Sequence, residues 1–152
     1  MKRSIVALSA LILVAAAAEL RAGPIEEVAQ IAGPRGQALL EGNVDAYVAA
    51  FADNAVFYSA LTPFRIEGKE AIRGYFAALF QAYPKRRVIQ RQPLMRAYND
   101  DLVIQNAYVE LYFTDQKGDT MTSPLRLSVI WAKVGGQWQI VDQHGSRLPM
   151  PR

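Results

Sequence analysis

The sequence predicts an α+β fold in which N-terminal helices pack on an antiparallel sheet formed by the second half of the chain. Two observations support this prediction. Apolar residues recur at helical spacing in the first half, whereas the second half consists of strand-like runs separated by short turn sequences. Short connections make consecutive strands antiparallel neighbours, and helices then cover one face of the sheet.

Two short helical segments come first, at residues 25–31 and 35–41. We expect Gly33 and Pro34 to separate them, because a proline inside a helix costs about 3 kcal/mol but suits a first helical turn. Gly42 ends the second segment, as glycine commonly does at helix C-termini. The domain is therefore expected to begin with a broken helix.

A third helix begins after Asn43, which is a favourable N-cap, and ends near Asp53. Two short strands are expected next, at residues 55–60 and 64–67. The apolar residues of this third helix fall on one face: Val44, Tyr47, Val48 and Phe51.

The clearest helix of the sequence spans residues 69–83 and ends before Pro84. Its amphipathic stripe consists of Ile72, Phe76, Leu79, Phe80 and Tyr83. The strand-like runs of the second half are 87–98, 101–114, 121–134 and 137–146. The connections between them have turn chemistry: Asn99-Asp100, residues 116–119 and Gly135-Gly136.

The start of the chain is typical of a secretory signal peptide. Met1-Lys2-Arg3 is positively charged, and residues 4–18 form an uncharged, mainly apolar run. This run is shorter than the ~20 residues that a membrane span needs. We expect cleavage after Ala18 or Ala22, and we expect residues 23–152 to form one periplasmic or secreted domain without a membrane span.

Charge and composition limit the classes of partner. The full chain carries a formal net charge of +3, and removal of Lys2 and Arg3 lowers it to +1. Nucleic-acid binding requires a basic surface, so we expect no nucleic-acid partner, and we interpret the cluster Lys85-Arg86-Arg87 as a solvated strand entry. The chain has no cysteine and one histidine, His144. We therefore expect neither a metal site nor a cofactor.

Short motifs occur in a recognisable order along the chain. They are Gly42-Asn43-Val44-Asp45, Phe51-Ala52-Asp53-Asn54-Ala55, Ile66-Glu67-Gly68-Lys69-Glu70-Ala71-Ile72, Trp131, Gly136-Gln137-Trp138-Gln139-Ile140-Val141 and His144-Gly145-Ser146-Arg147-Leu148-Pro149. Together they resemble the nuclear transport factor 2-like superfamily, in its SnoaL-like branch. The C-terminal motifs are especially similar to the association domain of calcium/calmodulin-dependent kinase II. The resemblance covers nearly the whole of residues 23–152.

The resemblance implies a cone-shaped roll, in which a curved sheet wraps a long helix and leaves a pocket at the wide end. Members of the superfamily usually form homodimers through the outer face of the sheet. Some are isomerases, polyketide cyclases, hydrolases or dehydratases, and others only bind or assemble. The fold alone therefore does not decide the function.

The known chemistries of the superfamily do not carry over to this chain. The general base of ketosteroid isomerase aligns with Ser59, and its oxyanion-binding tyrosine aligns with Gly36. Its second oxyanion group, an acid, has no counterpart on the strand that holds Val129 and Ile130. The kinase domain binds acidic ligands through a histidine and arginines, whose positions hold non-basic residues here: Ile72, Glu110, Val129 and Gly145.

Strand parity assigns the pocket side of the sheet, because directly paired residues share a face. If Thr114 pairs with Met121, Tyr108 lies opposite Leu127 and faces the pocket. The expected ligand pocket is mostly aromatic and aliphatic: Phe57, Ser59, Phe64, Ile72, Phe76, Tyr108, Tyr112, Leu127, Val129 and Trp131.

Three ionisable residues are candidates for catalysis. Glu110 shares the face of Tyr108, where desolvation would raise its pKa toward the range of a general base. The direction of Asp142 and His144 depends on the Gly135-Gly136 turn. A two-residue turn places both in the pocket, whereas a three-residue turn with a bulge turns both to the outer, dimer-forming face.

The leading hypothesis is an exported domain that binds a small, largely apolar molecule and forms a homodimer. An isomerase, cyclase or hydrolase that uses Glu110 or the Asp142–His144 pair for proton transfer is one alternative, and an assembly module is another. A cavity with two convergent ionisable groups would favour the enzyme, and a cavity without them would favour the binding protein.

Overall fold

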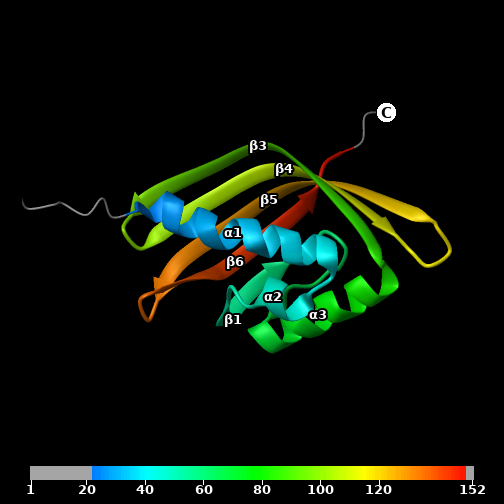
Figure 1. Ribbon diagram of the computed structural model, residues 1–152, viewed down its shortest axis with the longest axis horizontal. Coiled ribbons are helices and arrows are strands. Elements are labelled where there is room, and N and C mark those ends of the chain that lie inside the picture. The colour runs from blue at the N-terminus through cyan, green and yellow to red at the C-terminus, as the bar shows by residue number, and fades with distance from the viewer. Residues whose placement is uncertain (1–21, 150–152) are drawn as a thin grey trace, which may run out of the picture.

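The computed structural model describes residues 22–149 (Figure 1). In chain order the elements are α1 (Pro24–Glu41), α2 (Val44–Val48), β1 (Phe51–Tyr58), β2 (Ile66–Glu67), α3 (Lys69–Ala82), β3 (Lys85–Asn99), β4 (Leu102–Thr114), β5 (Thr120–Val134) and β6 (Gln137–Arg147). The expected signal peptide, residues 1–22, lies outside the described part of the chain except for Ala22. Among the described residues, no helix is long and apolar enough to cross a membrane.

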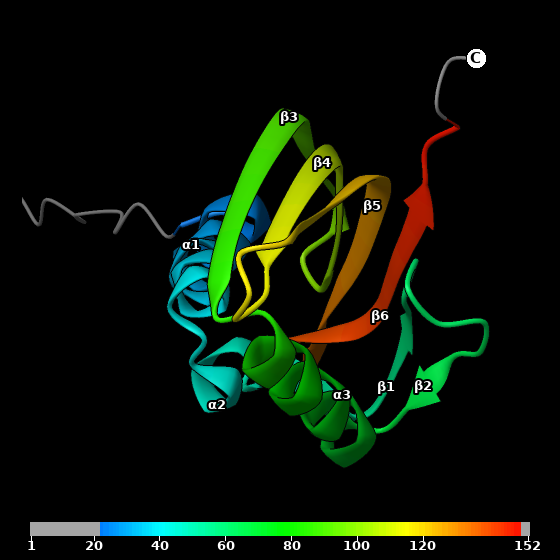
Figure 2. The same cartoon turned by 90° about the vertical axis from the view of Figure 1, so that its right-hand side faces the viewer.

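The strands form one curved sheet in the order β2-β1-β6-β5-β4-β3 (Figure 2). Strands β3 to β6 are antiparallel neighbours, as their short connections predicted. Strand β1, which belongs to the first half of the chain, pairs in parallel with β6, so the six-stranded sheet as a whole is mixed. The short-connection argument applies only to consecutive strands, whereas β1 and β6 meet after a long excursion of the chain.

The three helices lie on one side of this sheet (Figures 1 and 2). Beneath them, one row of directly paired residues crosses four strands and is fully buried: Phe51, Ile140, Trp131 and Val103. Complete burial of each aliphatic or phenyl side chain stabilises the fold by about 1.5–3 kcal/mol. This row forms the apolar centre on which the helices rest.

Helix α1 is continuous through Pro34, so the predicted break at Gly33 and Pro34 is wrong. Pro34 removes only one N–H, and it lies on the exposed side of the helix, where the freed carbonyl group can be solvated. Burial of Val28 before the proline and Ala38 after it holds both halves on the same core. Tertiary packing thus overrides the local penalty.

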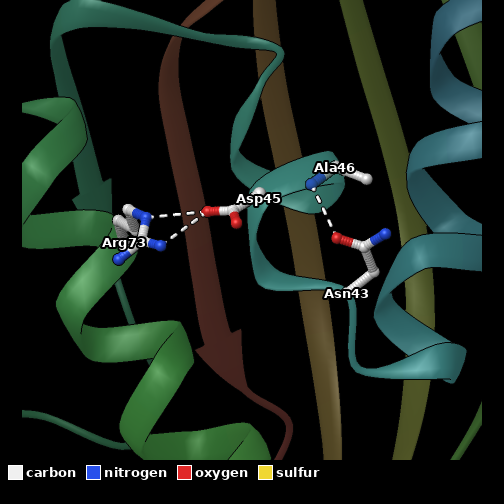
Figure 3. A network of polar contacts seen from close by, with 4 residues as sticks. All are labelled: Asn43, Asp45, Ala46 and Arg73. Carbon is white, nitrogen blue, oxygen red and sulfur yellow. Dashed lines mark hydrogen bonds and ion pairs between the residues drawn. The ribbon is translucent and has the colours of Figure 1, made fainter.

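Helix α2 begins at the predicted N-cap but is shorter than predicted. Asn43 Oδ1 accepts a hydrogen bond of 3.0 Å from Ala46 N, and Asp45 pairs with Arg73 of α3 (Figure 3). The chain becomes extended at Phe51, because Phe51 pairs with Ile140 and the Ile140 N–H donates to the Ala50 carbonyl.

Arg86 has a structural role that its position in a basic cluster did not predict. Its guanidinium donates to the Leu39 and Leu40 carbonyls at the end of α1 and to the Phe80 and Tyr83 carbonyls at the end of α3. Cations stabilise helix C-termini through these unpaired carbonyl groups. The expectation that the whole cluster is a solvated strand entry is therefore wrong for Arg86.

Candidate ligand-binding site

The register between β4 and β5 decides which β4 side chains face the helices. Thr114 pairs with Thr120, one residue earlier than expected, because Asp115 Oδ1 accepts hydrogen bonds from Lys117 N and Asp119 N and closes the intervening loop. A slip of one residue reverses every side chain of the strand. Tyr108, Glu110 and Tyr112 therefore point away from the helices, and their expected pocket orientation is wrong.

Strand β6 combines features of both expected registers. The Gly135-Gly136 turn is a two-residue turn, since Val134 pairs with Gln137. A bulge at Val141 then shifts the pairing, so that Ile130 lies opposite Asp142 and Val129 opposite Gln143. Trp138 and Ile140 consequently face the core, while Gln143 faces the helices and the side chains of Asp142 and His144 lie on the outer face.

A cavity of about 180 Å³ lies between the inner face of the sheet and helices α1 and α3. It is lined by Ala32, Arg35, Gly36, Leu39, Tyr47, Phe57, Tyr58, Ser59, Ala60, Leu61, Tyr75, Phe76, Leu79, Val88, Gln90, Gln105, Val109, Leu111, Phe113, Leu125, Leu127, Val129, Gln143 and Gly145. Most of these residues are aliphatic or aromatic, which is the usual character of a small-molecule site.

Five residues of the expected pocket line this cavity: Phe57, Ser59, Phe76, Leu127 and Val129. Ile72 and Trp131 are instead fully buried in the core. Phe64 is 81% exposed in the loop after β1. Tyr108 and Tyr112 lie on the outer face, as the observed register requires.

Arg35 brings a cation to the cavity wall. Its Nε donates to the Tyr47 carbonyl at 3.2 Å, and its Nη2 donates to Gln143 Oε1 at 2.7 Å. The guanidinium also lies over the aromatic rings of Tyr47 and Phe51, with its carbon 4.0 and 5.0 Å from the ring centroids. Burial lowers the pKa of Arg35 from its ordinary value, and contact with Tyr47 opposes this shift.

Aromatic rings and a pair of hydroxyl groups form another wall. The Phe57 ring lies 5.2 Å from the Phe76 ring and 5.5 Å from the Tyr75 ring. The Tyr75 hydroxyl group shares a hydrogen bond of 2.7 Å with Ser59 Oγ, which also accepts from Leu61 N. Burial raises the pKa of Tyr75, and the hydrogen bond with Ser59 partly offsets this. The pair is therefore neutral at physiological pH.

Glu110 lies on the outer face among polar partners. It accepts hydrogen bonds from Arg91 Nε at 2.7 Å and from the Tyr112 hydroxyl group at 2.8 Å. These bonds lower the pKa of Glu110, with the Arg91 bond the larger cause. The expected rise in its pKa is wrong, because the charged form is hydrogen-bonded and solvated rather than desolvated.

Asp142 and His144 are also separated from the cavity by the sheet. Burial raises the pKa of Asp142, and His144 opposes the shift. The His144 ring lies 5.3 Å from the Tyr58 ring. Within residues 22–149, no three His, Cys, Asp or Glu side chains are grouped so that they could hold a metal ion.

Arg35 is the main cavity residue that sequence reasoning missed, whereas Gln143 was expected on the inner face only in the register with a bulge. Arg35 lies on the same face of helix α1 as Val28, Ala32 and Leu39. A cation on this otherwise apolar face could have indicated that Arg35 lies at the cavity. This pattern was not recognised, because the predicted break at Pro34 divided the helix into two segments. The position of Gln143 depends on the β6 bulge, for which the sequence carries no clear mark.

The curved mixed sheet, with N-terminal helices on one side and the cavity between them, has the nuclear transport factor 2-like fold, which is also described as cystatin-like. The sequence matches the profile of the calcium/calmodulin dependent protein kinase II association domain family over residues 25–149, and the chain belongs to that family. The resemblance that its motifs indicated is thus confirmed. A comparison with curated proteins found no match.

Similar solved structures share this fold at low sequence identity. A nuclear transport factor 2-like protein of Salmonella enterica serovar Typhimurium LT2 has a TM-score of 0.74 at 15% identity, over 85% of this chain and 94% of that one. A candidate kinase II association domain of Xanthomonas campestris has a TM-score of 0.72 at 22% identity, over 86% and 95%. A protein of unknown function from Pseudomonas putida KT2440 has a TM-score of 0.70 at 21% identity, over 82% and 86%.

Proposed function

We propose that this domain binds a small, largely apolar molecule in the cavity between the sheet and helices α1 and α3. The cavity itself, about 180 Å³ with mainly apolar walls, is the observation that carries the proposal. Apolar cavities of about 150 Å³ hold a molecule the size of benzene. A ligand with one aromatic ring and a short chain therefore suits the available space.

The polar groups of the cavity support binding rather than proton transfer. Those that the structure describes there are one guanidinium, phenol and hydroxyl groups, and the amides of Gln90, Gln105 and Gln143. A general acid or base works best when its pKa is close to the working pH, and arginine and tyrosine titrate far above it. Glu110, Asp142 and His144, on which the enzyme alternative depended, lie on the outer face.

We further propose that the domain is exported and acts as a homodimer. The charged start and the apolar run of residues 4–18 support export to the periplasm or outside the cell. The family is named for association, which supports the pairing of two copies of the domain. The interface that we propose is the outer face of the sheet. Native mass spectrometry of protein purified from its own host tests both the dimer and a retained ligand. A monomer without ligand would contradict this proposal.

A substitution that fills the cavity tests binding directly. Gly36 lines the cavity, and a Cβ atom added there meets no atom within 4 Å, so Gly36→Leu adds a side chain at the cavity wall without a backbone clash. Gly33 on the same helix is equally open but does not line the cavity, which makes Gly33→Leu a matched control. Calorimetric titration with 4-phenylbutanol should detect binding to wild type and to Gly33→Leu, with at least about tenfold weaker binding to Gly36→Leu.

A further inference from the structure

The charge of Arg35 has no counter-charge within the part of the chain that the structure describes. The four ion pairs found there involve other cations: Arg65, Arg73, Arg91 and Lys133. No lining residue of the cavity is an aspartate or a glutamate. A cation in apolar surroundings is unfavourable unless a partner compensates it.

Arg35 also retains unused hydrogen-bond donors. A guanidinium carries five N–H groups, and the hydrogen bonds to the Tyr47 carbonyl and to Gln143 use two of them. The rings of Tyr47 and Phe51 offer their faces to the cation but no carboxylate.

Two glutamine side chains add donors to the cavity wall, and one of them, Gln143, contacts Arg35. Gln105, Val129 and Gln143 are directly paired on three adjacent strands, and all three line the cavity. Gln143 Oε1 accepts from Arg35, and Gln105 Oε1 accepts from Trp131 Nε1 at 3.2 Å. Each glutamine therefore keeps its amide nitrogen as a donor, and neither nitrogen has an acceptor among the described residues.

We infer that the cavity selects an apolar molecule that carries a carboxylate, with the carboxylate bound by Arg35 and assisted by Gln143 and Gln105. This inference rests on the proposed binding function and names its ligand class. A planar guanidinium matches a carboxylate through two parallel hydrogen bonds. The apolar part of the ligand packs against Phe57, Phe76 and Leu127, which line the remainder of the cavity.

Arg35 lies on helix α1 and occupies none of the positions through which the kinase domain binds acidic ligands. Those positions hold Ile72, Glu110, Val129 and Gly145 here. The anion site is therefore a property of this chain's own residues, produced by a continuous α1 that brings Arg35 against Gln143.

Two probes of equal length test the inference. The carboxylate 4-phenylbutyrate and the neutral alcohol 4-phenylbutanol are titrated separately into the full-length protein at neutral pH, with calorimetry as the readout. We expect the carboxylate to bind wild type about 10- to 100-fold more tightly than the alcohol, because hydrogen bonds between charged groups are stronger than neutral ones. Arg35→Gln should reduce this ratio to near one.

Control variants separate loss of the charge from loss of the fold. Arg65→Gln removes an exposed arginine outside the cavity and should leave the ratio unchanged. Arg35→Lys keeps the charge but loses the bidentate hydrogen-bond geometry, so we expect an intermediate ratio of the two affinities. If Arg35→Gln does not fold by circular dichroism, the wild-type ratio and Arg35→Lys still decide the question.

The outcomes distinguish this inference from the binding function on which it rests. Equal affinity of wild type for both probes overturns the carboxylate inference but leaves apolar binding in place. Failure of wild type to bind either probe counts against both. A carboxylate preference that survives unchanged in folded Arg35→Gln also overturns the assignment to Arg35.

Discussion

Arg35 Nη2 donates a hydrogen bond of 2.7 Å to Gln143 Oε1, and this bond joins helix α1 to strand β6 across 108 positions of the sequence. Both residues line the cavity, and Gln143 is buried. The contact therefore contributes to the stability of the fold and positions a cation at the proposed ligand site.

Gln143→Leu should destabilise the protein by about 1–3 kcal/mol, because Arg35 loses its side-chain acceptor while remaining on the cavity wall. Chemical denaturation measures the free energy of unfolding. Gln137→Leu is a suitable control, since Gln137 is exposed at the start of the same strand. Equal stability of the two variants would show that the Arg35–Gln143 bond contributes little.

Gln143→Glu should weaken binding of 4-phenylbutyrate by about tenfold or more, because the new carboxylate pairs with Arg35 and repels the ligand carboxylate. Binding of 4-phenylbutanol should change much less. The ratio of the two affinities, obtained by calorimetric titration, is the measurement. An unchanged ratio would place the carboxylate of the ligand elsewhere in the cavity.

Trp131→Ala should cost about 3–5 kcal/mol of stability, because Trp131 is fully buried in the row of core residues that crosses the sheet. Phe64→Ala should change stability by less than about 0.5 kcal/mol, because Phe64 is largely exposed. Thermal or chemical unfolding of both variants checks their placement. A small effect at Trp131 would argue against its position in the core.

Asn43→Ala should cost about 1 kcal/mol, because Ala46 N loses the side-chain acceptor that caps helix α2 (Figure 3). Asn54→Ala, at an exposed position of β1, serves as the comparison. The difference in denaturation midpoint between the two variants measures the cap. A midpoint for Asn43→Ala equal to that of the comparison would contradict the capping role.

Glu110 should make stability depend on pH in the acidic range. Hydrogen bonds from Arg91 and Tyr112 hold its pKa below the ordinary value of 4.5. A carboxyl group with a lowered folded-state pKa stabilises the protein above its unfolded-state pKa, and this contribution disappears as the pH falls through the folded-state value. Wild type should thus lose more stability than Glu110→Gln between about pH 7 and pH 3. Denaturation series at several pH values test this, and parallel curves for the two proteins would refute it.

Much of the secondary structure could be predicted because its signals are local. The stripe from Ile72 to Phe80 predicted α3, the Asn43 cap predicted the start of α2, and Gly135-Gly136 predicted the turn between β5 and β6. Each of these signals depends on residues within a few positions of one another. Local propensity and spacing are sufficient in such cases.

The candidate site was predicted less completely, because face assignment depends on register. The loop that Asp115 closes shifts the β4–β5 pairing by one residue from the expected register, and the bulge at Val141 shifts the β5–β6 pairing. Each shift exchanges the two faces of a strand. Tyr108, Glu110 and Tyr112 were therefore assigned to the wrong side, Gln105 was missed, and the direction of Gln143 was left open.

The sequence by itself determined the α+β class, most of the elements and the family, because periodicity, capping residues and turn residues are carried by neighbouring positions. Only the tertiary structure decided that β1 runs parallel to β6, that α1 continues through Pro34, and that Arg35 reaches Gln143. These features result from burial and pairing between segments far apart in the chain. They are stable only when the whole core has formed, so no local pattern encodes them.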